Sequence, residues 1–273
     1  MAALRCAYID LDGTLLGRGA SLVHDGDGEP SLLGVRAVEA CLRAEVEIVL
    51  VSGRRAAQMA EDSRLLGQRA YVFEAGAGLV VDGDTYWSTG AFDPAGERTI
   101  HDQIADTGAP ALLLERYAGR LEYHDPYHRG RQVSHLLRGL VDVDEANALV
   151  ESHGLRLLDN GAAHRRSPAL ADLPELRVYH LVPHDTAKVN GVARHMRMRG
   201  YERPETIAIG DSREDLRMHE VTGTFWLVGN ALDRDPALGP QVSRTPNARI
   251  AEGGHGAGVY EAIVTTLAEG RGG

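Results

Sequence analysis

The chain has 273 residues, 43% hydrophobic and 25% charged, which is typical of a soluble globular protein with one large domain or two smaller ones. A net charge of -10 argues against nucleic acid as a main partner, because phosphate backbones attract basic surfaces. No apolar run approaches the roughly 18 residues of a membrane span and no export signal is visible, so we expect no membrane partner.

The first part of the chain alternates predicted strands and helices. Strands are predicted at residues 4–9, 46–51 and 71–73, and helices at residues 31–43 and 55–66. Ser31 suits a helix N-cap, and Gly67 suits a helix end. Cys6 and Cys41, the only cysteines, lie in apolar surroundings. They predict buried thiols in a reducing cytoplasm.

The middle of the chain has a different pattern. Short alternating strands are predicted at residues 79–81, 85–88, 131–137 and 177–181, with helices at residues 94–106 and 144–153. About a hundred residues of this α+β pattern interrupt a parallel-sheet domain, which indicates an inserted cap. We therefore expect a catalytic core of residues 1–78 and 182–273 and a cap of residues 79–181.

After residue 180 the strand and helix alternation resumes. Helices are predicted at residues 186–199, 213–221 and about 256–268, and strands at residues 206–209 and 224–228. Such repetition in both terminal parts favours an α/β fold with a parallel sheet and helices on both of its faces.

Polar side chains cluster at the ends of three predicted strands, and a lysine opens the helix that re-enters the sheet domain. In an open parallel sheet, ligands bind beyond the carboxyl ends of the strands. The residues are Asp10, Asp12, Ser52, Gly53, Arg54, Lys188, Asp211 and Asp215. Singly, they also fit a strand-ending turn, a helix cap and exposed surface charges. Their joint placement favours one site.

This set of residue types suits phosphoryl transfer. Clustered carboxylates repel one another, and Mg²⁺, which prefers oxygen ligands, would neutralise them. A lysine and a hydroxyl can balance the charge on the phosphoryl oxygens. Asp10 and Asp12 are one residue apart, so in an extended chain both point the same way. One could attack phosphorus while the other protonates the leaving oxygen.

Four segments in order resemble the motifs of the haloacid dehalogenase superfamily. They are DLDGT from Asp10, VSGR from Val51, DTAKVNG around Lys188, and GDSREDLRM from Gly210. The insertion after the third strand resembles the large α/β cap of the sugar-phosphatase branch of that superfamily. That branch includes mannosyl-3-phosphoglycerate phosphatase, sucrose-phosphate phosphatase and phosphomannomutase. The resemblance covers the core, and the cap matches in position and length.

The resemblance implies a role for each matching residue. Asp10 would be the nucleophile and a Mg²⁺ ligand, and Asp12 the general acid and base, binding Mg²⁺ through its backbone carbonyl. Ser52 and Gly53 would bind the phosphoryl group, and Lys188 would neutralise the aspartate and phosphate charges. Asp211 would bind Mg²⁺, and Asp215 would complete or orient the metal shell.

Two positions depart from the pattern of the family. Related caps often follow a Glu-Asn-Gly sequence, whereas FEAGAG here has Ala75 at the asparagine position. The fourth motif often carries asparagine where this chain has Glu214. Both departures concern substrate positioning and the metal shell and leave the expected catalytic groups in place.

The predicted cap concentrates positive charge. Residues 115–139 hold five arginines and three histidines against three acids, which suits a second anionic or hydroxyl-rich group on a substrate. Strand alternation puts Arg131, Val133 and His135 on one face and Gln132, Ser134, Leu136 and Arg138 on the other. Which face meets the site stays open, as does a solvated surface for any single residue. The candidate substrate contacts are Arg54, Arg131, His135, Arg138 and His180.

We therefore expect a Mg²⁺-dependent phosphatase that acts on a small phosphorylated metabolite. A sugar phosphate or glycosyl-phosphoglycerate is the expected substrate, by resemblance, and an aspartyl phosphate the expected intermediate. A phosphosugar mutase of the same fold and a non-catalytic ligand-sensing protein are the alternatives. The sequence leaves the oligomeric state open.

Overall fold

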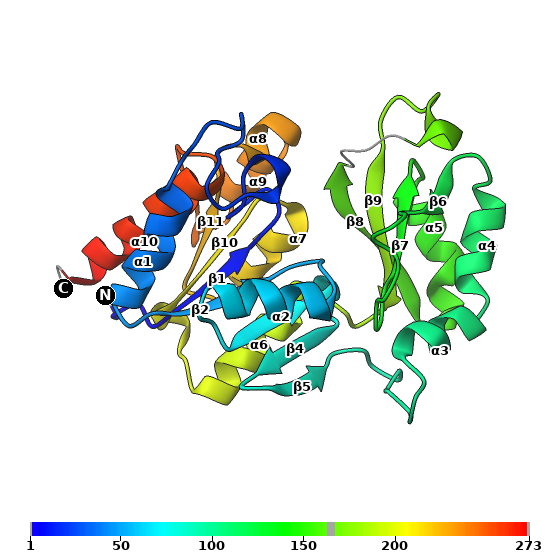
Figure 1. Cartoon of the computed structure of the whole chain (residues 1–273), viewed down its shortest axis with the longest axis horizontal. Coiled ribbons are helices and arrows are strands. Elements are labelled where there is room, and N and C mark those ends of the chain that lie inside the picture. Colours follow the sequence, from blue (N-terminus) through cyan, green and yellow to red (C-terminus); the bar gives the residue numbers. More distant parts are fainter. Residues whose placement is uncertain (1, 163–166, 272–273) are drawn as a thin grey trace.

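The computed structural model describes residues 2–162 and 167–271, and these form an eight-stranded sheet and a four-stranded sheet (Figure 1). The two sheets lie side by side, and the chain passes between them twice, once after β5 (Asp84–Trp87) and once before α6 (Lys188–Arg199). Within the described ranges, no helix has the length and apolar character needed to cross a membrane.

The large sheet has the strand order β12-β11-β10-β1-β2-β3-β4-β5. Its parallel strands are β1 (Cys6–Asp10), β2 (Glu47–Val51), β3 (Ala70–Phe73), β10 (Thr206–Gly210), β11 (Thr224–Leu227) and β12 (Ala248–Ile250). The strands β4 (Gly78–Val81) and β5 (Asp84–Trp87) extend one edge in antiparallel pairing. The expected α/β fold with a parallel sheet is confirmed.

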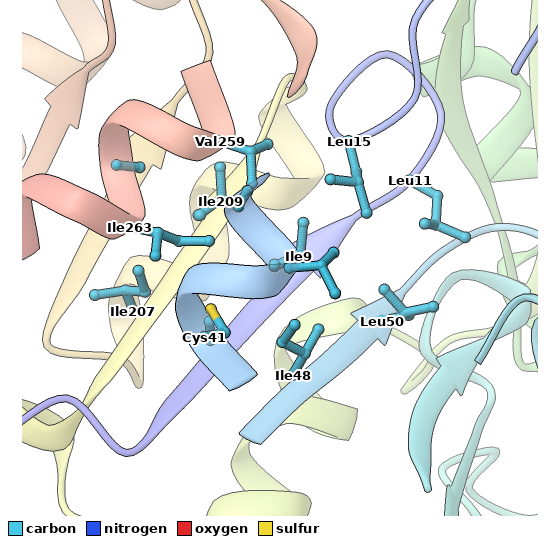
Figure 2. Packing of buried hydrophobic residues seen from close by; sticks show 14 of the residues in the cluster. Ile9, Leu11, Leu15, Cys41, Ile48, Leu50, Ile207, Ile209, Val259 and Ile263 are labelled. Carbon is cyan, nitrogen blue, oxygen red and sulfur yellow. The ribbon is translucent and has the colours of Figure 1, made fainter. Parts of the chain in front are cut away.

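Helices cover both faces of this sheet because its strands are apolar on both sides. In β1, Ala7 and Ile9 pack with α1 (Leu33–Arg43) and α10 (His255–Arg271), as Figure 2 shows for Ile9. Their neighbours Cys6 and Tyr8 join the cluster on the opposite face. That face carries α6 (Lys188–Arg199), α7 (Arg213–Leu216), α8 (Ala231–Arg234) and α9 (Leu238–Ser243), while Met59 of α2 (Ala56–Leu65) joins the first cluster.

The small sheet is antiparallel, in the order β6-β7-β9-β8, and it is covered on one face. Its strands are β6 (Leu121–Tyr123), β7 (His135–Gly139), β8 (Leu155–Ala162) and β9 (Arg177–Pro183). The helices α3 (Ile100–Asp106), α4 (Ala109–Arg116) and α5 (Val143–Val150) pack on the face that carries Leu137 and Tyr179. In Figure 1 these helices lie on the far side from the large sheet.

Three strand predictions within the expected cap need correction. The strands predicted at residues 79–81 and 85–88 belong to the large sheet, because β4 folds back on β3. The chain reverses through Glu74, Ala75 and Gly76, which have φ values of 47, 59 and 100°. The strand predicted at residues 131–137 begins only at His135. Strand periodicity indicates an extended segment but does not identify the sheet that the segment joins.

Candidate active site

A buried lysine joins two buried aspartates at the carboxyl edge of the large sheet. Asp10 ends β1, Lys188 opens α6, and Asp215 lies in α7. The Nζ atom of Lys188 donates to Oδ1 of Asp10 and to Oδ1 of Asp215, each at 2.7 Å. Burial raises the pKa of Asp10, and Lys188 opposes that shift. Burial lowers the pKa of Lys188, but the two carboxylates outweigh it and raise that pKa.

Asp215 is held in place by the first turn of its own helix. Its Oδ2 accepts from the backbone N–H groups of Asp211 and Ser212, each at 3.2 Å, and from Oγ of Ser212 at 2.6 Å. Ser212 in turn caps α7, since its Oγ accepts from the Asp215 N–H. Both carboxylate oxygens of Asp215 are therefore hydrogen-bonded before any ligand arrives.

Asp211 adds a third carboxylate to this site. Ligand atoms of Asp10, Asp211 and Asp215 all lie within 4.8 Å of one another. Asp211 also pairs with Arg234 at 2.5 Å and accepts from Thr14. Burial first, and then Asp215, raises the pKa of Asp211 to about 6. Three carboxylates in one partly dry site are a donor set that fits a hard cation such as Mg²⁺.

Asp12 lies at the rim of this cluster and is exposed. Arg54 holds its carboxylate through two contacts, from Nε at 2.7 Å and from Nη2 at 2.6 Å. Arg54 also binds Asp62 at 2.8 Å. Because β1 ends at Asp10, strand alternation does not set the direction of Asp12. Its side chain is not among the three carboxylates that converge, so its expected role in proton transfer stays a prediction.

The loop after β2 is one place where the large and small sheets meet. Ser52 is buried, and its Oγ accepts from the N–H of Arg54 at 3.2 Å. The carbonyl of Gly53 accepts from Nη1 of Arg131 at 3.0 Å. A Cβ atom at Gly53 would lie 2.8 Å from Nε2 of His180. The structure thus brings Ser52, Gly53, Arg131 and His180 together.

Two other predicted substrate residues lie elsewhere in the small sheet. His135 is on the helix-covered face, where it stacks on His101 with ring centroids 3.8 Å apart, and both of its ring nitrogens have partners. His135 therefore lies on the face away from Gly53 and His180, and its expected contact with substrate stays a prediction. Arg138 is on the opposite face, the one that carries His180, and it pairs with Glu122 at 2.7 Å. Alternation predicted these two faces but not which one the helices cover.

His135 predicts a pH dependence of stability. Burial, with the charge of His101 second, lowers the pKa of His135 to about 4. Between pH 6.5 and about 4, His135 binds a proton in the unfolded chain but stays neutral in the folded protein. The free energy of unfolding therefore falls as the pH falls. From pH 7 to pH 5 this residue should cost about 2 kcal/mol. Urea unfolding at both pH values should show a smaller loss for His135→Gln and an unchanged loss for His184→Gln, which alters an exposed histidine. Equal losses in all three proteins would contradict the assignment.

Glu74 is a functional candidate that the sequence analysis did not single out. This fully buried carboxylate accepts from the consecutive N–H groups of Gln132, Val133 and Ser134 at 2.6 to 3.0 Å. It also accepts from Oγ of Ser134. Glu74 follows β3 of the large sheet, whereas its partners lead into β7, so the contact fastens one sheet to the other. Glu74 is the glutamate of the FEAGAG segment, in which the sequence analysis considered only Ala75.

We expect Glu74→Ala to loosen this connection. Three backbone N–H groups would lose their acceptor, and a buried unpaired group costs about 1–3 kcal/mol, so the free energy of unfolding should fall by at least about 2 kcal/mol. Hydrogen exchange at residues 132–134 should accelerate more than tenfold. Glu74→Gln, which retains an acceptor oxygen, should show a smaller effect. Unchanged exchange at these amides in Glu74→Ala would refute this role.

The two departures from the family pattern both lie near the start of α6, where Lys188 is placed. Oε1 of Glu214 accepts from the Lys188 backbone N–H at 3.2 Å and so caps the start of α6. Ala75 adopts left-handed backbone, a conformation that asparagine tolerates better than alanine. The next residue, Gly76, lies so close to α6 that a Cβ there would be 2.1 Å from the Ala187 carbonyl. This segment therefore supports the helix end that presents Lys188.

Comparison with known proteins finds a family model and relatives that are similar to this chain. Residues 175–244 match the family model described as haloacid dehalogenase-like hydrolase. Phosphoglycolate phosphatase of Archaeoglobus fulgidus is 25% identical over 93% of both chains. Phosphoglycolate phosphatase of Methanoculleus marisnigri is 27% identical over 95% of both.

Solved structures show the same fold at low identity. A protein of Thermoplasma acidophilum superposes with a TM-score of 0.67 at 18% identity, covering 97% of this chain and 98% of its own. The sucrose-phosphatase of Synechocystis sp. PCC6803, solved with sucrose and phosphate, gives 0.64 at 16% identity with the same coverage. In sequence and in fold the chain is thus similar to enzymes named as phosphatases. The matched segment and the two near full-length relatives make the chain similar to haloacid dehalogenase-like hydrolases.

Proposed function

We propose that the protein is a Mg²⁺-dependent phosphatase that hydrolyses a small phosphate monoester through an aspartyl phosphate on Asp10. The observation that carries this proposal is the buried contact of Lys188 with both Asp10 and Asp215, at 2.7 Å each. The contact fixes a carboxylate next to a permanent positive charge at the edge of the sheet where ligands bind.

Each residue of the site has a proposed task. Asp10 would attack phosphorus with its carboxylate, and Lys188 would oppose the rise in the pKa of that carboxyl that burial causes. Since Oγ of Ser52 accepts from the Arg54 N–H, its hydroxyl proton is free to donate to a phosphoryl oxygen. Asp12 would protonate the leaving oxygen and later activate water, once its pairing with Arg54 loosens.

Asp10, Asp211 and Asp215 would hold Mg²⁺, with the backbone carbonyl of Asp12. The bound cation would supply positive charge next to the phosphoryl oxygens. Arg234 pairs with Asp211 in the described structure and would keep that carboxylate oriented.

The segment between β5 and α6 would act as a cap over this site. The face of the small sheet that carries His180 lies against the loop after β2, and Arg131 donates to the carbonyl of Gly53. The hydrogen bonds of Arg131 within the described residues go to neutral oxygens of Tyr127, Gly53 and Ser134. A buried guanidinium with such partners suits a carboxylate or a hydroxyl-rich group on the substrate.

We propose a small phosphorylated acid as the first substrate to test. The two near full-length relatives are phosphoglycolate phosphatases, and Arg131 offers a positive charge at Gly53, the residue after Ser52. Sugar phosphates and glycosyl-phosphoglycerates, the classes expected from the family resemblance, form the second group. Arg131→Met should raise KM for phosphoglycolate more than KM for a neutral sugar phosphate if the charge recognises the acid.

The test of the function is phosphate release from these substrates with and without Mg²⁺. We expect activity with Mg²⁺, its loss on adding EDTA, and its recovery when Mg²⁺ is restored in excess. An isomerised sugar phosphate in place of free phosphate would establish the mutase alternative. Ligand binding without turnover of any phosphate ester in the panel would establish the sensing alternative.

A further inference from the structure

A second polar cluster lies at the opposite end of β1 from Asp10. Cys6 begins β1, and its register partner on the neighbouring strand is Glu47, the first residue of β2. His195 is seven residues beyond Lys188, about two turns along α6, so both side chains face the sheet. Helix α6 therefore contacts β1 at the catalytic end through Lys188 and at the other end through His195.

The geometry of this cluster is that of a set of metal ligands. Ligand atoms of Cys6, Glu47 and His195 lie within 4.8 Å of one another, and Cys6 and His195 are fully buried. Nδ1 of His195 lies 2.9 Å from the Tyr8 hydroxyl. Nε2 of His195 is buried without a hydrogen-bond partner among the described residues, 3.6 Å from Oε1 of Glu47. A buried polar atom without a partner calls for an explanation.

The carboxylate of this cluster is already oriented by its neighbours. Oε2 of Glu47 accepts from the Tyr201 hydroxyl at 2.8 Å, and Oε1 accepts from Arg199 at 3.2 Å. Glu47 is the half-buried member of the set, so it marks the side from which an ion would enter. The fixed direction of this carboxylate lowers the entropy lost on binding an ion.

We propose that Cys6, Glu47 and His195 form a second metal site, which takes a thiolate-preferring transition metal of the Zn²⁺ type. Sulfur, nitrogen and carboxylate ligands are the ones that Zn²⁺ uses, whereas Mg²⁺ takes oxygen ligands. Tyr8 would hold the imidazole so that Nε2 faces the ion, as outer partners of metal-bound histidines do. Cys6 would bind as thiolate and release its proton to solvent.

Cobalt distinguishes this site from the acidic cluster. Wild-type protein held in excess Mg²⁺ and a reducing agent would be titrated with Co²⁺ while absorption is recorded. A thiolate bound to Co²⁺ produces a near-ultraviolet charge-transfer band, which carboxylates do not produce. We expect this band to saturate at one Co²⁺ per chain and to disappear when Zn²⁺ is added. Absence of the band in wild-type protein would overturn the proposal.

The other cysteine provides a matched control. Cys41 lies in the cluster of Figure 2, on the opposite face of the sheet from Cys6. Cys6→Ser should lose the band and Cys41→Ser should keep it. Tyr8→Phe should weaken Co²⁺ binding about tenfold. A band that survives in Cys6→Ser or vanishes in Cys41→Ser would refute the site.

Should Cys6→Ser fail to fold, His195→Gln decides the question. That variant should bind Co²⁺ at least tenfold more weakly, and unchanged affinity would refute the site. None of these measurements reads phosphatase activity, so the outcome is independent of the proposed function.

Discussion

The Asp10→Asn protein should release phosphate at least about 10,000 times more slowly than the wild type, since losing a catalytic nucleophile costs that much or more. The amide keeps the shape of the side chain but cannot attack phosphorus. Asp10 is buried beside two other carboxylates, and burial and their charges raise its pKa. Removal of one of these negative charges should leave stability unchanged or raise it. Phosphate release in excess Mg²⁺ and urea unfolding measure the two effects.

Asp62→Asn is the matched control for that experiment. Like Asp10, Asp62 pairs with a basic side chain of the site, in its case Arg54. Its carboxylate lies outside the cluster that contains Asp10. We expect its activity to change by no more than a few-fold. Substantial turnover in Asp10→Asn, after mass spectrometry excludes reversion to aspartate, would refute the nucleophilic role.

Lys188→Met should be the most destabilising single change at the site. It leaves two buried carboxylates without their shared cation, and breaking a buried ion pair typically costs about 3–5 kcal/mol. Activity should also disappear, because the charge that balances Asp10 and the phosphoryl group is gone. Urea unfolding, monitored by circular dichroism, measures the loss. Arg234→Met, which removes a half-exposed partner of Asp211, should cost less.

A double variant separates this charge effect from lost packing. In Asp10→Asn/Lys188→Met only Asp215 remains unpaired, so part of the stability lost in Lys188→Met should return. Additive changes in the free energy of unfolding would mean that the two side chains do not interact, in conflict with their 2.7 Å contact.

The core site was predictable from sequence because its residues are tied to element ends. Asp10 follows an apolar strand, Lys188 begins a helix, and Asp215 lies one turn after another strand, so topology alone brings them to one edge. Carboxylate and lysine chemistry then indicated phosphoryl transfer. The roles of the individual residues came from the family resemblance and stay predictions.

Contacts between segments that are distant in the chain could not be predicted from the sequence. The partners of Glu74 are about sixty residues away, in a segment predicted as strand that is irregular in the structure. Strand alternation separated His135 from Arg138, but only the packing of α3 shows which of the two is covered. Helix α4 went unpredicted because it is short and follows α3 after Gly108. The cluster of Cys6, Glu47 and His195 likewise depends on the register of β1 and β2.

Lys188 is the only lysine in the sequence, and it is buried. The folded protein therefore presents no lysine amine at its surface. Amine-directed acylating reagents would reach this side chain only when the contact with Asp10 and Asp215 opens. The rate at which such a reagent modifies Lys188 therefore measures how often the active site opens, without an introduced label.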